Sequence, residues 1–205
     1  MPLTAKETTS NYELPPEGTA LCICNRVIDL GLQVSPTYNT TSHKILLGFR
    51  LVDTVGTDGQ ALDVSNRYTL SLSEKAILRK HLESWRGRAF SAEELKGFDV
   101  TKLLGVPALV TIKHDMNPGN GKTYANIAGI SALPKSMGKP APLPADDLVL
   151  FVIGETNEGV LDGLHEKLAE TVRAGMARMK QADAGEQATK EHQQAAADFD
   201  DDIPF

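Results

Sequence analysis

The sequence predicts a mainly β protein, built on a five-stranded barrel with a helical insert between the third and fourth strands. Three observations lead to this prediction. Apolar and polar residues alternate in several stretches of residues 18–135, turn-forming residues separate these stretches, and the apolar period becomes helical after the third stretch.

The first two strands are expected over residues 19–34 and 44–52. The first is rich in β-branched side chains, and Gly31 within it predicts a bulge or bend. The second alternates, with Lys44, Gly48 and Arg50 on the outward face. The opposite, inward face is expected to carry Ile45, Leu47, Phe49 and Leu51.

A third strand is expected in residues 63–72, after the turn VGTDGQ, and a helix follows it. Ser71 and Glu74 have the spacing of a capping box, and the apolar helical positions end at Gly87. Ser91 with Glu94, and Asp99, predict two further short helical turns. The stretches PALVTIKHDM and KTYANIAGISAL, on either side of the turn NPGNG, complete the set as strands four and five.

This order of elements is that of an OB-fold, in which a helix closes the end of a five-stranded barrel between strands three and four. The OB-fold domain is expected over residues 18–135, after a flexible N-terminal arm of residues 1–17.

Residues 136–180 are expected to form a proline-rich connector, an extra strand LVLFVI and a C-terminal helix capped by Asn157. The apolar stripe of this helix must pack on the barrel or on a second copy, which would make a homodimer. From residue 181 the composition predicts a disordered linker that leads to an acidic interaction tip ending at residue 205. The stripe consists of Val160, Leu161, Leu164, Leu168 and Val172.

Charge is distributed unevenly along the chain. The net charge is −6, but residues 18–135 hold 14 Lys and Arg against 10 Asp and Glu. A mildly basic body with an acidic tail is typical of proteins that bind nucleic acid.

Catalysis and membrane insertion are not expected. The histidines (His43, His81, His114, His165 and His192) have no metal-binding spacing, and no catalytic triad or carboxylate pair stands out, so we expect no enzyme, no metal and no cofactor. Cys22 and Cys24 alternate in the first strand and are expected to be reduced core thiols. Without a long apolar segment or a secretory signal, the expected location is the cytoplasm.

An OB-fold binds single-stranded nucleic acid in a basic groove with aromatic side chains that stack on bases. By strand parity, the DNA-contacting candidates lie on outward faces and in the loop between strands one and two. Phe49, Tyr68 and Trp85 are in phase with apolar neighbours and are expected in the core. The candidates are Tyr38, Lys44, Arg50, Arg67, Lys113, Lys122 and Tyr124.

The segment DFDDDIPF combines acidic and apolar residues where a purely solubilising tail would carry only charge. A phenylalanine ring can fill an apolar pocket of a partner while its carboxylate bonds to an Arg or Lys, and aspartates meet a basic rim. We therefore expect this segment to bind partner proteins. Its residues are Asp198, Phe199, Asp200, Asp201, Asp202, Ile203, Pro204 and Phe205.

These last eight residues resemble the C-terminal tip of bacterial single-stranded DNA-binding proteins. The whole chain looks more like the phage-encoded members, which pair a divergent OB-fold with a host-like acidic tip; the body lacks the usual bacterial sequence pattern. The resemblance implies a non-catalytic protein that coats single-stranded DNA with little sequence preference. It also implies recruitment, through the tip, of helicases, exonucleases, primase or recombination proteins for DNA replication, recombination and repair.

An adaptor or decoy is the alternative function. Such a protein would bind host enzymes of DNA metabolism through the tip without binding nucleic acid, and the small positive charge of the body is compatible with it.

Overall fold

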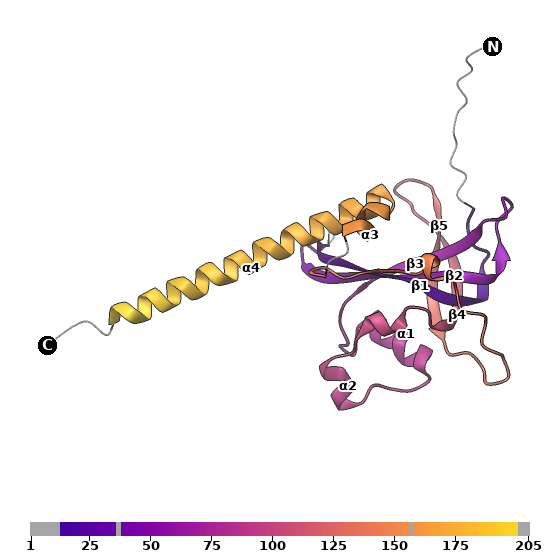
Figure 1. Ribbon diagram of the computed structural model, residues 1–205, viewed down its shortest axis with the longest axis horizontal. Helices are drawn as coiled ribbons and strands as arrows, with labels where there is room; N and C mark the ends of the chain where they lie inside the picture. The colour runs from indigo at the N-terminus through magenta and orange to yellow at the C-terminus, as the bar shows by residue number, and fades with distance from the viewer. Residues whose placement is uncertain (1–12, 36–37, 156–157, 201–205) are drawn as a thin grey trace, which may run out of the picture.

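A six-stranded sheet dominates the part of the chain that the computed structural model describes, which is residues 13–35, 38–155 and 158–200 (Figure 1). The strand order is β3-β2-β1-β4-β5 with antiparallel pairing throughout, and β6 pairs in parallel with β1. The strands are β1 (Gly18–Val34), β2 (Thr41–Val55), β3 (Ala61–Thr69), β4 (Pro107–Met116), β5 (Thr123–Ser131) and β6 (Val149–Phe151).

The prediction of a mainly β fold is confirmed. Within the described ranges no ladder joins β3 to β5, so the sheet is open at this edge. All five strands expected in residues 18–135 are present, and the extra strand expected in residues 148–153 is β6.

The long strand β1 organises the sheet because it bends. It pairs with β4 through residues 18–23, with β2 through residues 22–34 and with β6 through residues 26–28. Its register against β2 shifts twice, and the second shift lies between Asp29 and Gly31. Gly31 has a φ of 65°, which confirms the bulge predicted there.

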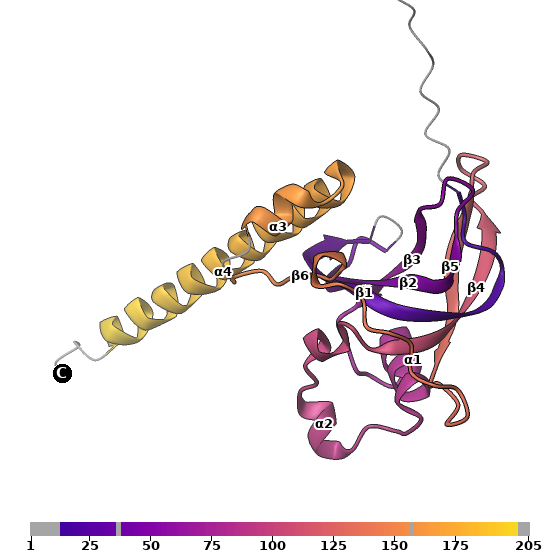
Figure 2. The ribbon, with the colours of Figure 1, turned by 45° about the vertical axis from the view of Figure 1, so that its right-hand side comes forward.

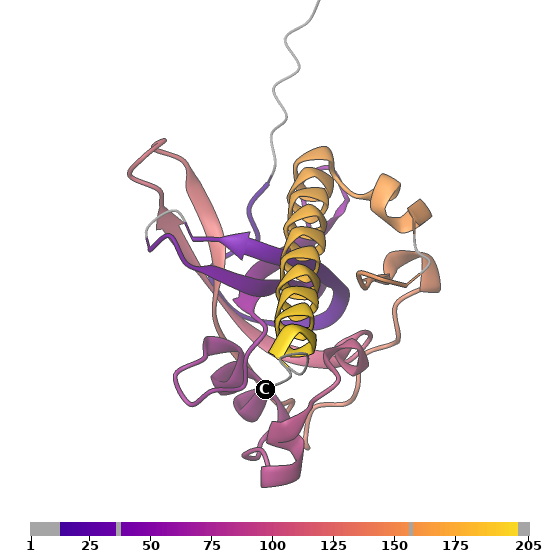
Figure 3. The ribbon, with the colours of Figure 1, turned by 90° about the vertical axis from the view of Figure 1, so that its left-hand side faces the viewer.

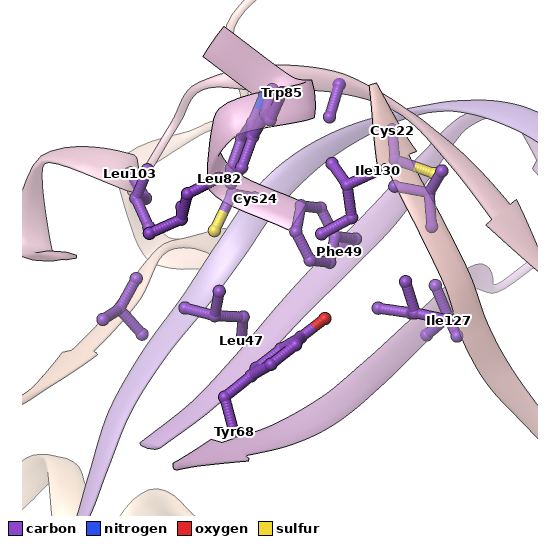
Figure 4. Close-up of a cluster of buried hydrophobic side chains, with 14 of the residues drawn as sticks. Cys22, Cys24, Leu47, Phe49, Tyr68, Leu82, Trp85, Leu103, Ile127 and Ile130 are labelled. Atoms are coloured by element: carbon purple, nitrogen blue, oxygen red, sulfur yellow. The ribbon is translucent and has the colours of Figure 1, made fainter. Parts of the chain in front are cut away.

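The main hydrophobic core lies between the curved sheet and helix α1 (Ile77–Arg86), as Figure 4 shows. The rings of Phe49 and Trp85 meet in a tilted contact, 5.4 Å between centroids. Tyr68 is also buried, and its hydroxyl is 3.0 Å from Nδ1 of His81 on α1. The core role predicted for these three aromatic residues is therefore confirmed, as is the inward face of β2: Ile45, Leu47, Phe49 and Leu51.

Both cysteines are free and fully buried in this core. Burial raises the pKa of Cys22 and of Cys24 to about 12, since an apolar environment disfavours the thiolate. The prediction of reduced core thiols is confirmed.

We expect both thiols to resist an aromatic disulfide reagent at pH 8 in the native protein, because the thiolate is the reactive form. In denaturant, two thiols per chain should react within seconds to minutes. Colorimetric titration with and without denaturant measures this. Rapid reaction of both thiols in the native protein would contradict the buried placement.

The helical insert between β3 and β4 contains α1, α2 (Ala92–Lys96) and the 3₁₀ turn η1 (Val100–Leu103). Gly87 ends α1 in the left-handed conformation, and Ser91 with Glu94 forms the predicted capping box of α2. Asp99 caps η1 by accepting a hydrogen bond from the backbone N–H of Thr101.

The capping box predicted at Ser71 is wrong. Helix α1 begins at Ile77, after Ala76, which offers no side-chain cap. Ser71 Oγ instead accepts a hydrogen bond from the N–H of Ser73, 3.2 Å away, within a turn. The burial of Leu78, Leu82 and Trp85, rather than the upstream Ser71 and Glu74, determines where α1 begins.

A second hydrophobic cluster lies on the outer side of β1 and β2. It is covered by β6, α3 (Glu158–Gly163) and α4 (Glu166–Asp200), which occupy the side of the sheet away from α1 and α2 (Figure 2). The five residues of the predicted apolar stripe all belong to it, so the stripe packs on the chain's own sheet. The single predicted helix is divided into α3 and α4, and its expected cap, Asn157, lies outside the described residues.

Helix α4 crosses β1 at very close range (Figure 3). A Cβ atom at Gly175 would overlap the carbonyl oxygen of Leu30, and one at Gly31 would lie 2.7 Å from the carbonyl carbon of Gly175. Polar contacts fix the crossing: Gln33 Nε2 donates to the carbonyl of Thr171 (3.0 Å), and Arg178 Nη1 to that of Leu32 (3.2 Å).

Two segments expected to be loose are ordered in part. Helix α4 continues to Asp200, where a disordered linker was predicted from residue 181, because alanine, glutamine, glutamate and lysine all favour helix. In the predicted arm, Glu13 accepts hydrogen bonds from the N–H and hydroxyl of Thr57, and the carbonyl of Pro15 lies 2.8 Å from His114 Nε2. Residues 1–12 and 201–205 lie outside the described part of the chain.

Candidate nucleic-acid interface

Two hollows lie end to end along β3. The first, of about 1000 Å³, is bounded by Asp63–Ser65 of β3, by residues 122–126 at the start of β5, and by Leu14, His165 and Lys167. We call it the β3–β5 hollow. The second, of about 410 Å³, is bounded by Lys44, by residues 66–69 of β3 and by residues 75–78 before and within α1. We call it the β3–α1 hollow, and the two together the β3 track.

Three cations from three different elements line the β3–α1 hollow. Lys44 comes from β2, Arg67 from β3 and Lys75 from the turn before α1. Pairing of β2 with β3 sets Lys44 opposite Thr69, which brings Lys44 to the end of β3. None of the three forms a salt bridge to another described residue, so their charge is available to an anion.

The beginning of α1 lies at the same hollow. Ala76, Ile77 and Leu78 line it, and Ala76 provides no side-chain cap for the first N–H groups of the helix. The positive end of the helix dipole therefore adds to the charge of the three cations.

Tyr124 is the aromatic residue of the β3–β5 hollow. Its side chain is 43% exposed, and its hydroxyl accepts a hydrogen bond of 2.9 Å from Asn120 Nδ2. The ring also borders a smaller hollow of about 510 Å³ with Met116 and Pro118 on the other side. A ring fixed in this way, with apolar neighbours, is a suitable surface for stacking a base.

Arg50 faces outward as predicted, but the rest of the chain covers it. Its Nε and Nη2 donate to the two carboxylate oxygens of Asp63 (2.8 and 3.2 Å), and its Nη1 donates to Asp147 (2.7 Å). Arg26 adds a 2.5 Å ion pair to Asp63. These pairs hold the pKa of Arg50 above its usual range and leave its side chain only 18% exposed. Arg50 thus attaches the turn η2 (Ala145–Asp147) to the sheet and is not available to a ligand.

The other predicted contacts divide into two groups. Lys44, Arg67, Lys122 and Tyr124 line the β3 track. Lys113 and Tyr38 line neither hollow: Lys113 bonds to Asp115 at 2.7 Å, which raises the pKa of Lys113, and Tyr38 is exposed on the connection between β1 and β2.

Sequence reasoning missed Lys75, His165 and Lys167. The misplaced helix start hid Lys75, which lies in the turn before α1. The other two lie more than 30 residues after β5, His165 in the connection between α3 and α4 and Lys167 in α4, and no local pattern connects them to β3. The pairing of Arg50 with a carboxylate could have been found from the β2–β3 hairpin, because Asp63 lies directly opposite Arg50 in that pairing.

Comparison of the sequence with protein-family models and with curated proteins finds no match. Within the described ranges, no group of three His, Cys, Asp or Glu side chains is placed to hold a metal ion. The helices described here are each too short or too polar to cross a membrane.

Proposed function

We propose that this protein binds single-stranded DNA without catalysis and with little sequence preference, through the β3 track. The observation that carries the proposal is the β3–α1 hollow, whose three cations form no salt bridge to another described residue, next along β3 to the hollow that holds Tyr124. Lysine and arginine neutralise phosphates of any sequence, and every base has a face that can stack on an aromatic ring.

The geometry favours a single strand over a duplex. Residues 63–69 of β3, which connect the two hollows, extend over about 20 Å at 3.3 Å per residue. Tyr124 can reach the face of a base only when that base is unpaired. A strand bound along β3 would have phosphates at Lys44, Arg67 and Lys75 and a base at Tyr124.

We further propose that the sheet belongs to the OB-fold class. Support comes from the strand order β3-β2-β1-β4-β5, from α1 after β3, and from the approach of β3 to β5 across the first hollow. In OB-folds the nucleic acid binds on the same region of the barrel, around strands two and three.

The partner-binding role of residues 198–205 is the second part of the proposal. Its support is the combination of four aspartates with two phenylalanines, an isoleucine and a proline. Helix α4 carries Asp200 away from the sheet (Figure 1). Enzymes of DNA replication, repair and recombination with a basic-rimmed apolar pocket are the expected partners.

Titration of a fluorescent 20-nucleotide oligo-dT against the full-length protein tests DNA binding. Each neutralised phosphate lowers the logarithm of the affinity by about 0.7 for each tenfold increase in salt concentration. For three phosphates, the affinity should therefore fall roughly 20-fold between 50 and 200 mM salt. A labelled duplex of the same length serves as the control and should bind more weakly.

The adaptor or decoy function has its own support, because Arg50 and Lys113 are neutralised by carboxylates within the chain. An adaptor would leave the anisotropy of oligo-dT unchanged at 50 mM salt. That result would refute the DNA-binding proposal and leave the recruiting segment as the function.

A further inference from the structure

A third site, separate from the β3 track, lies where α1 meets the start of β4. It is a cavity of about 300 Å³, walled by Trp85 of α1, Leu103 of η1, Val106 before β4 and Leu133 after β5. Trp85 Nε1 donates to the carbonyl of Pro107 at 2.9 Å, so its polar atom is satisfied and its ring serves as an apolar wall. Val106 is 37% exposed at the opening.

The charged groups of this cavity are both cationic. Its lining contains Arg86 and Lys139 and no acidic residue. Arg86 lies over the ring of Phe90, 4.3 Å from the centroid, and bonds to Glu94 through Nη2. Arg86 Nη1 is buried without a hydrogen-bond partner, and Lys139 forms no salt bridge to another described residue. Glu94 compensates the charge of Arg86, so Lys139 supplies the positive charge of the cavity, which suits an apolar side chain with a negative charge beside it.

The size of the cavity limits the ligand to a short peptide segment. A volume of about 300 Å³ is at the lower end for ligand sites, with room for one aromatic side chain and a small neighbour. Within this chain, residues 198–205 have the matching chemistry, since this segment combines two phenylalanines, an isoleucine and a proline with four aspartates.

The segment cannot reach the cavity of its own chain. Arg178 of α4 bonds to the carbonyl of Leu32 in β1, and the helix continues to Asp200, about 33 Å further at 1.5 Å per residue. It leads away from α1 and β4 (Figure 1). Residues 201–205 span at most about 18 Å when fully extended, which is too short for a return.

We infer that this cavity binds residues 198–205 of a second copy of the protein. Such a contact is head-to-tail, because two different surfaces meet, and repeated contacts of this kind produce closed rings or open rows of copies. In an open row the copies would coat single-stranded DNA cooperatively. Cooperative coating rests on the proposed function, whereas the contact between copies does not require DNA.

A labelled peptide of residues 196–205, titrated into the full-length protein, tests the inference. We expect saturable binding that weakens at least tenfold in Val106→Asp and in Lys139→Glu, both at the rim of the cavity. The matched controls are Val55→Asp at the exposed end of β2 and Lys180→Glu on α4, which should bind the peptide like the unmodified protein. A peptide with both phenylalanines replaced by alanine should not bind.

Failure of the peptide to bind the unmodified protein would overturn the inference, as would equal binding by cavity and control variants. The oligo-dT titration keeps the two proposals separate. Peptide binding without oligo-dT binding would refute the DNA-binding function and leave the contact between copies standing. Oligo-dT binding without peptide binding would refute the contact between copies and leave the DNA-binding function standing.

Discussion

Replacement of Arg67 by glutamate is expected to weaken oligo-dT binding by about 10- to 100-fold. Arg67 lies on the outward face of β3 and lines the same hollow as Lys44 and Lys75, and no described carboxylate neutralises it. A hydrogen bond to a charged group contributes about 1.5–3 kcal/mol, which corresponds to this range of affinity. Loss of one phosphate contact should also reduce the steepness of log affinity against log salt concentration by about 0.7. Fluorescence anisotropy at several salt concentrations measures both quantities.

Lys96→Glu is the matched control for this prediction. Lys96 is exposed on α2, pairs with Glu93 and lines neither hollow of the β3 track. The same reversal of charge should therefore change oligo-dT affinity less than threefold, because it acts on the DNA only through long-range electrostatics. Equal loss of affinity in the two variants would show that net charge, rather than the β3 track, governs binding.

Replacement of Gly175 by alanine is expected to destabilise the protein by about 2 kcal/mol or more. The added Cβ would overlap the carbonyl oxygen of Leu30, and the helix cannot move away without loosening the second hydrophobic cluster. Overpacking of this kind typically costs about 1–3 kcal/mol, and the obstacle here is rigid backbone. For a chain of this size the melting temperature should fall by roughly 4–8 °C.

Gly185→Ala on the same helix is the control. No heavy atom lies within 4 Å of a Cβ built at Gly185, and alanine favours helix over glycine by up to about 1 kcal/mol. Thermal unfolding followed by circular dichroism should therefore give opposite shifts for the two variants. Equal melting temperatures would mean that α4 does not pack on β1 at the distance described.

The sequence predicted those parts of the fold that local periodicity determines. The alternation in β2 identified its buried face, and Gly31 identified the bulge in β1. Leu46 broke the alternation because the outer face of β2 is also covered, by the second hydrophobic cluster. Local periodicity could not reveal this, since the covering helices lie more than 100 residues further along the chain.

The candidate site was predictable only in part, for the same reason. Strand parity placed Lys44 and Arg67 on outward faces, and both line the β3–α1 hollow, but parity could not show that Asp147, almost 100 residues away, neutralises Arg50. Nor does any local signal mark Gly175, whose lack of a side chain matters only because Gly31 and Leu30 lie against it. In residues 181–200, the low apolar content suggested a linker, although the same residue types also favour helix.

Helix α4 also has a consequence for spacing. Because it remains helical for about 22 residues beyond Arg178, which bonds to the sheet, its length sets the separation between residues 198–200 and the β3 track. A helix is stiff over this range, so in the proposed complex a captured enzyme would stand at a defined height above the strand. Insertion or deletion of seven residues would change that height by about 10 Å and turn the segment by only about 20°.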